Sequence, residues 1–127
     1  MDGTKDNKRL LFTIDEAYIT KYNLDISYLG KRIVIYDDRY THIEKHRFEF
    51  SNQSSYEYVI KNIDFIVKEP DFIVIDENKK GVEFVKTLAD NVLVAARITM
   101  SSEMKIKSLY PINETKKQRL ESQRTNK

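Results

Sequence analysis

The spacing of the hydrophobic positions changes midway along the chain. Before residue 70 they recur mostly at three- and four-residue steps between short β-branched runs, and after residue 70 they alternate with polar positions. A period near 3.6 residues predicts amphipathic helices, and a period of two predicts half-buried strands. The chain therefore predicts an α+β fold, with N-terminal helices packed on a four-stranded antiparallel β-meander.

The first half of the pattern predicts short strands that alternate with helices. Its clearest helix covers residues 55–68, where Tyr56, Val59 and Ile63 share one face and Pro70 ends the pattern. The expected elements are a strand over 9–14, a helix over 15–22, a strand over 31–36, a helix over 38–47 with Asp38 as its N-cap, and the helix over 55–68.

The second half predicts the meander. Its expected strands cover residues 71–76, 82–88, 92–100 and 104–110. Strict alternation along the last strand predicts two faces, one with Lys105, Lys107 and Leu109 and the other with Ile106, Ser108 and Tyr110.

The length of 127 residues fits one domain with a single core. We expect residues 1–30 to form an N-terminal extension of a strand and a short helix, residues 31–113 to form the main domain, and residues 114–127 to form a basic tail. Residues 1–8 and 114–127 are polar enough to be frayed ends, with Leu120 as the tail's one strong apolar residue.

Composition excludes several classes of protein. The absence of cysteine excludes a disulfide scaffold, a thiolate nucleophile and cysteine-based zinc or iron–sulfur sites. No apolar run reaches the roughly 18 residues of a transmembrane helix, and the polar N-terminus lacks the apolar segment of a signal peptide. We therefore expect a cytoplasmic protein without membrane contact.

The net charge of +2 is unevenly distributed. Residues 91–127 carry eight Lys or Arg against three Asp or Glu, whereas residues 1–90 carry 14 against 17. This excess of positive charge suits a polyanionic partner, and it equally suits a solvated charged tail.

The only two histidines, His42 and His46, are four residues apart within an expected helix and so share one face. Such a pair can perform acid–base chemistry near neutral pH, can chelate zinc with a third ligand, or can lie on a polar surface. Residue 43 is Ile, where the metalloprotease motif requires Glu, and nothing in the sequence marks a third ligand.

Cationic and hydroxyl side chains gather on the last two expected strands. Placed on adjacent strands, such groups can bind a phosphate through charge-assisted hydrogen bonds, although the outer face of a sheet accounts for each residue singly. No glycine-rich phosphate loop accompanies them, since the chain has three widely separated glycines. The candidates are Arg97, Thr99, Lys105, Lys107, Ser108 and Tyr110.

The order of these segments resembles the phage-associated nuclease-like domains of the barnase, EndoU, colicin nuclease and RelE superfamily. The resemblance covers about residues 31–113 and leaves the first 30 outside it. It is carried by Thr41-His-Ile-Glu-Lys-His46, an amphipathic helix, Lys68-Glu-Pro-Asp-Phe-Ile-Val-Ile75, Asp90-Asn-Val-Leu-Val-Ala-Ala-Arg-Ile98 and Lys107-Ser-Leu-Tyr-Pro-Ile112.

The resemblance implies metal-independent RNA cleavage without a cofactor, by attack of the RNA 2′-hydroxyl on the adjacent phosphate. It implies acid–base roles for His42 and His46, and phosphate orientation or proton transfer by Ser108 and Tyr110. Charge on the phosphate is then stabilised by Arg97 and Lys107, with Thr99 and Lys105 as further substrate contacts.

The partners that the resemblance implies are RNA, with tRNA as one candidate, and a host or immunity protein, in the host cytoplasm if the chain is phage-encoded. The oligomeric state stays open. The alternative function is a non-catalytic phage inhibitor with an anti-defence role, which binds a host protein or nucleoprotein complex.

Overall fold

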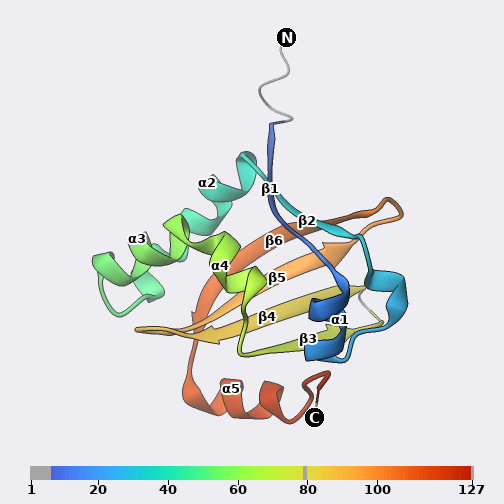
Figure 1. The fold of residues 1–127 in the computed structure, drawn as a ribbon. Coiled ribbons are helices and arrows are strands. Elements are labelled where there is room, and N and C mark those ends of the chain that lie inside the picture. Colours follow the sequence, from blue (N-terminus) through green and yellow to red (C-terminus); the bar gives the residue numbers. More distant parts are fainter. Residues whose placement is uncertain (1–6, 79, 127) are drawn as a thin grey trace.

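A six-stranded mixed sheet forms the centre of the computed structural model, which describes residues 7–78 and 80–126 (Figure 1). The elements, in chain order, are β1 (Lys8–Thr13), α1 (Glu16–Tyr22), η2 (Ile26–Tyr28), β2 (Arg32–Tyr36), α2 (Asp38–Glu44), η3 (Arg47–Glu49), α3 (Gln53–Lys61), α4 (Ile63–Lys68), β3 (Phe72–Asp76), β4 (Gly81–Thr87), β5 (Asn91–Ile98), β6 (Glu103–Ile112) and α5 (Glu114–Glu121).

The sheet has the strand order β1-β2-β6-β5-β4-β3, in which only β2 and β6 run parallel. The expected meander is present as β3 to β6, but the prediction of four purely antiparallel strands is wrong. Two N-terminal strands join at β6, because the free edge of β6 over Glu103–Lys105 offers backbone groups with which Arg32–Val34 can pair. Most of the expected extension over residues 1–30 thus belongs to the same sheet and core, while residues 1–6 lie outside the described residues.

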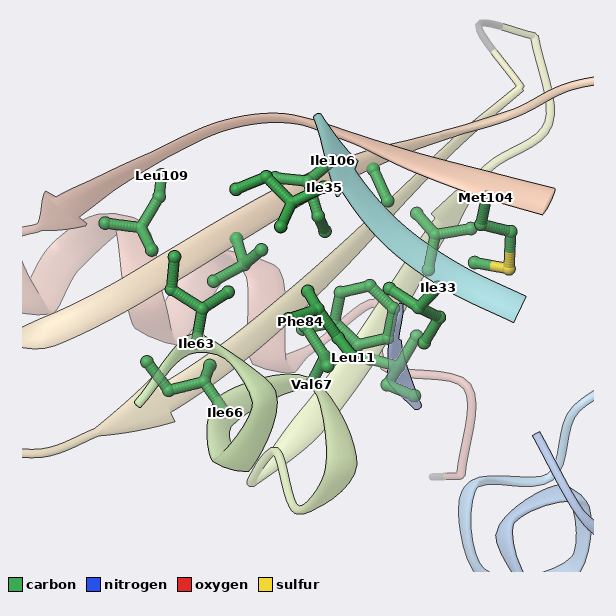
Figure 2. Packing of buried hydrophobic residues seen from close by; sticks show 14 of the residues in the cluster. Leu11, Ile33, Ile35, Ile63, Ile66, Val67, Phe84, Met104, Ile106 and Leu109 are labelled. Atoms are coloured by element: carbon green, nitrogen blue, oxygen red, sulfur yellow. The ribbon is translucent and has the colours of Figure 1, made fainter. Parts of the chain in front are cut away.

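Helices α1, α3 and α4 pack their apolar side chains on one face of the sheet, which we call the inner face. Figure 2 shows Ile63, Ile66 and Val67 of α4 directed at Phe84 and its neighbours in the sheet. All four side chains are fully buried. The β-branched and aromatic residues that gave the strands their signal therefore form the main core.

The helix predicted over residues 55–68 is two helices. Asn62 leaves the helical conformation at φ −126° and ψ 30°, and its side-chain amide donates to the Tyr58 carbonyl at 2.7 Å. This break ends α3 and redirects α4, so that Val59 and Ile63 both reach the core. The helix predicted over residues 38–47 ends at Glu44, and Asp38 is its first helical residue rather than its N-cap.

The C-terminal segment is folded rather than frayed between residues 114 and 126. Asn113 caps α5 by accepting a hydrogen bond from the Lys116 backbone at 2.7 Å. Leu120 is buried in a second apolar cluster on the outer face of the sheet, the face opposite the main core. Beyond the helix, the Thr125 backbone donates to the Ile73 carbonyl at 2.9 Å, which covers part of the exposed edge of β3.

A β-bulge changes the faces of β6. Ala95 pairs with Ser108 and Ala96 pairs with Ile106, so one extra residue of β6, Lys107, lies between these two pairs. Strict alternation is therefore wrong for this strand. Leu109 turns into the main core, whereas Lys105, two pairs away from Ser108, shares the outer face with Ser108 and Tyr110.

Candidate active site

The outer face of β5 and β6 forms the floor of the candidate site. Cross-strand partners lie on the same face, so Arg97 and Lys105 lie side by side with Gly81 beyond Arg97. The next row along the strands holds Ala95 and Ser108. Glu83 of β4 extends this row beyond Ala95.

Helix α2 and the turn η3 form one wall of the site. The strand β2 leaves β6 after Val34, and α2 then runs beside the freed edge. Arg39 donates to the Lys107 carbonyl at 3.3 Å, and the His46 ring lies 5.4 Å from the Tyr110 ring between centroids. Arg39 and His46 are seven residues apart, and Lys107 and Tyr110 are three residues apart. Seven residues of helix and three residues of strand each advance about 10 Å, so the two contacts lie at matching positions along the wall and the floor.

An open pocket of about 340 Å³ lies at the β2 end of this floor. Four cationic side chains line it against a single carboxylate, Asp38, so its charge favours an anion. Its lining also includes Tyr36. The Lys105 ammonium makes a cation–π contact with the Tyr36 ring, at 5.1 Å from the ring centroid. The cations are Arg39, Arg97, Lys105 and Lys107.

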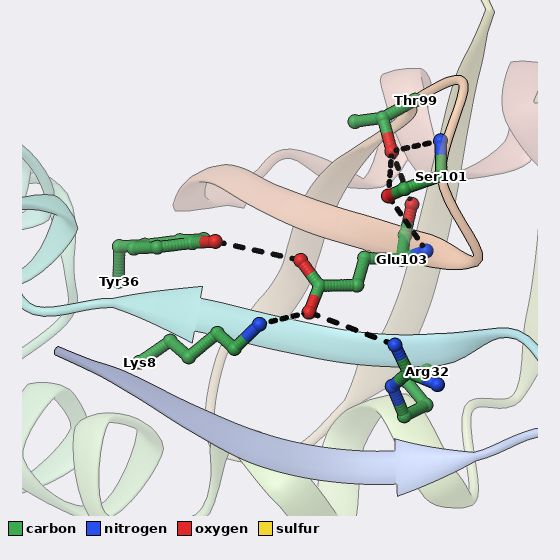
Figure 3. A network of polar contacts seen from close by, with 6 residues as sticks. All are labelled: Lys8, Arg32, Tyr36, Thr99, Ser101 and Glu103. Carbon is green, nitrogen blue, oxygen red and sulfur yellow. Dashed lines mark hydrogen bonds and ion pairs between the residues drawn. The ribbon is translucent and has the colours of Figure 1, made fainter. Parts of the chain in front are cut away.

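Tyr36 is held in place by Glu103, a carboxylate that is 6% exposed (Figure 3). Its oxygens accept from Lys8 and from the Tyr36 hydroxyl at 3.4 Å, and the Arg32 guanidinium lies 3.9 Å away. The Lys8 hydrogen bond is the main reason that the pKa of Glu103 lies below its usual value, against the opposing effect of burial. This network joins β1, β2 and β6 at the edge of the pocket.

Thr99 supports the turn between β5 and β6. Its hydroxyl donates to the Glu103 carbonyl at 2.8 Å and accepts from the Ser101 backbone at 3.3 Å (Figure 3). Thr99 is not part of the pocket lining, so the structure gives it a place in the turn instead of with the other candidate substrate contacts.

His46 is oriented by a carboxylate that sequence reasoning missed. Its Nδ1 lies 2.7 Å from Glu49 Oε2. Because a carboxylate only accepts, Nδ1 carries the proton in this pair and Nε2 is left for other partners. The signal was available in the sequence, since Glu49 follows His46 by three residues, one turn of the 3₁₀-helix η3.

His42 lies next to His46 on the same wall, with 6.2 Å between the ring centroids. Its pKa is lowered from the ordinary value of 6.5, first by desolvation and then by the positive charges of Arg39 and Lys45 and by His46. His42 is therefore largely neutral at pH 7. A neutral imidazole can accept a proton, so the site contains a candidate general base.

Tyr110 is contacted from both η3 and α5. His46 contacts its ring from η3, and the Lys116 ammonium of α5 lies 5.3 Å from the ring centroid. Burial, followed by the charges of Glu83 and Glu49, raises the pKa of Tyr110. Its hydroxyl thus stays protonated and able to donate a hydrogen bond over the neutral range.

Ser108 contributes a polar atom without a partner. Its Oγ is buried and makes no hydrogen bond within the described part of the chain. Leaving a buried hydroxyl unpaired costs about 1–3 kcal/mol, and such atoms in native proteins usually have a partner, which can be a protein group, an ordered water or a bound ion. The position of Ser108 between the cationic pocket and Tyr110 is consistent with an anionic ligand on this face.

The structure thus brings most of the sequence-predicted residues onto one side of the sheet. His46 lies beside Tyr110 with His42 next to it, and Arg97 and Lys105 lie on the same face of the sheet two residue pairs from Ser108. Sequence reasoning missed Tyr36, Arg39, Glu49 and Lys116. Among residues 7–78 and 80–126, no group of three or more His, Cys, Asp or Glu is arranged to hold a metal ion. In the same residues, no helix is both long and apolar enough to cross a membrane.

Comparisons with known proteins identify a family for this arrangement. The model of a family described as phage-Barnase-EndoU-ColicinE5/D-RelE like nuclease 3 matches residues 13–119. The match begins inside the expected extension over residues 1–30 and ends within α5, so it covers strands and helices beyond the expected range of 31–113. Neither the curated proteins nor the solved structures gave a match.

Proposed function

The chain belongs to the phage-Barnase-EndoU-ColicinE5/D-RelE like nuclease 3 family, and we propose a function for it on that basis. The proposed activity is metal-independent endonucleolytic cleavage of RNA by attack of a 2′-hydroxyl on its neighbouring phosphate. The observation that supports it best is His46, which lies between the Glu49 carboxylate and the Tyr110 ring at the end of a cationic floor.

The reaction needs a base and an acid on either side of one phosphate. His42, neutral near pH 7, takes the proton of the 2′-hydroxyl as that oxygen attacks phosphorus. His46, oriented by Glu49, acts as the acid in its imidazolium form, in which Nε2 is protonated as well as Nδ1, and it gives the Nε2 proton to the departing 5′-oxygen. One P–O bond forms and one breaks, leaving a 2′,3′-cyclic phosphate and a free 5′-hydroxyl. With their ring centroids 6.2 Å apart, the two imidazoles are close enough to hydrogen-bond to different oxygens of one phosphate that lies beside both rings.

The remaining residues stabilise the phosphate. Tyr110 donates from its protonated hydroxyl, and Ser108 supplies the buried hydroxyl that has no partner in the described structure. Lys107 is exposed beside Ser108 and neutralises developing negative charge. No step calls on a metal ion, because protons and charge are both handled by side chains of this chain.

The test is cleavage of purified tRNA and total RNA in the presence of EDTA. We expect cleavage by the wild type, and a loss of about 10²–10⁴-fold in His42→Ala and in His46→Ala. Lys61→Ala, which removes an exposed charge from α3 on the inner side of the sheet, serves as the control and keeps full activity. Products with 2′,3′-cyclic phosphate ends support the mechanism. Cleavage that EDTA abolishes, or that survives both histidine substitutions, would rule it out.

A further inference from the structure

The cationic pocket and the histidine pair lie at different points along β6. Lys105 pairs with Arg97 and Tyr110 pairs with Leu93, so the two are four ladder steps apart, which corresponds to roughly 13 Å at the usual rise of a strand. Lys105 is also directed toward β2, because its ammonium lies over the ring of Tyr36, the last residue of that strand. A phosphate held between His42 and His46 is therefore beyond hydrogen-bonding distance of the Lys105 ammonium.

The pocket has the features of a site for a second anion. Arg97 and Lys105 face each other across the β5–β6 ladder, and both are exposed to solvent. Arg39 closes the pocket from α2 while its guanidinium also binds the Lys107 carbonyl. The volume of about 340 Å³ exceeds what a single water or ion occupies and accommodates a phosphate with part of its sugar.

Helix α2 connects the two places. Arg39 borders the pocket, and one turn further along the same helix His42 borders the proposed reaction centre. Successive phosphates of one strand in a nucleic-acid duplex advance about 3.4 Å along the axis, so a separation of roughly 13 Å covers more than one nucleotide step. A polyanion that lies along β6 reaches both places at once.

We propose that this pocket binds a backbone phosphate of the RNA that is not the one cleaved. The substrate is then an oligonucleotide that extends beyond the cleaved bond, rather than a dinucleotide or a free nucleotide. This inference rests on the proposed function for the identity of the ligand. It assigns Arg97 and Lys105 to recognition of substrate length, in place of the contact of Arg97 with the cleaved phosphate that the family resemblance implies.

The test is binding, so that it does not depend on turnover. Fluorescein-labelled 2′-O-methyl RNA, which lacks the attacking hydroxyl, is titrated as a dinucleotide and as an octanucleotide of random sequence, with anisotropy as the readout. We expect Arg97→Ala and Lys105→Ala each to weaken binding of the octanucleotide about tenfold and to leave the dinucleotide unchanged. The slope of log affinity against log salt falls by about 0.7 for each lost phosphate contact.

Two controls make the result specific. Lys61→Ala also removes one exposed positive charge and leaves both affinities unchanged, whereas Lys105→Arg keeps the charge and retains most of the octanucleotide affinity. Equal weakening of both probes places these cations at the cleaved phosphate and overturns the proposal, as does an unchanged octanucleotide affinity. Failure of the proposed function gives a different result: the protein does not cleave RNA but still binds the octanucleotide in the length-dependent way described.

Discussion

Replacing Glu49 by Gln tests whether this carboxylate orients His46 for catalysis. The change removes the charge but keeps the length of the side chain and one oxygen that can accept a hydrogen bond. The Nδ1–Oε2 distance of 2.7 Å is that of a charge-assisted bond, which contributes about 1.5–3 kcal/mol when desolvated. The Glu49 side chain is 51% exposed, and screening by solvent brings pairs of this kind toward 1 kcal/mol or less.

About 1 kcal/mol of lost orientation corresponds to roughly a fivefold fall in kcat. KM is expected to stay constant or to fall slightly, because removing a negative charge beside the RNA also removes repulsion. A second readout is the tautomer of His46. The ¹⁵N spectrum of the wild type should show the proton on Nδ1, and the variant should show a mixture, because a Gln amide can either accept or donate.

Glu44→Gln is the matched control, since Glu44 is an exposed carboxylate at the end of α2, the helix that precedes η3. It makes the same change in charge and should alter KM only. The reasoning fails if Glu49→Gln leaves kcat unchanged, or if both variants lose kcat to the same extent, because the loss would then report local charge instead of the orientation of His46.

The remaining predictions concern pH and packing. Because the pKa of His42 lies below 6.5, the acid limb of the pH profile of kcat/KM should lie below pH 6.5. Arg39→Gln removes a positive charge that lowers this pKa and should move the limb to higher pH. A wild-type limb above pH 6.5 contradicts the assignment of His42 as the base. The lowered pKa of Glu103 favours the folded state above pH 4.5, and this stabilisation is lost as the pH falls. Glu103→Gln should therefore make stability depend less on pH below 4.5 when acid unfolding is measured by circular dichroism. An unchanged curve contradicts the role of the Lys8 hydrogen bond. Leu120→Ala should lower the free energy of unfolding by about 2–4 kcal/mol in urea titrations, since α5 buries this side chain against β3; a change under about 0.5 kcal/mol means that α5 is not docked.

The chain's hydrophobic periodicity was enough to predict the class of fold. The strands of the meander alternate because one of their faces is covered by helices, and the apolar stripe of residues 55–68 predicted helix at the right place. The shared face of His42 and His46 also follows from local geometry, since it requires only helical spacing. These features depend on neighbours within a few residues, which a sequence displays directly.

The candidate site depended on contacts that local periodicity does not record. At Lys107 the β5–β6 pairing shifts register by one residue. This bulge brings Lys105 onto the face of Ser108 and Tyr110. The parallel pairing of β2 with β6 is a contact between segments about 70 residues apart, and it sets where α2 leaves the sheet. The sequence by itself thus determined the elements, the histidine pair and the uneven charge, whereas the tertiary structure decided which side chains meet, because strand pairing and register are selected by burial of the whole sheet and not by any one segment.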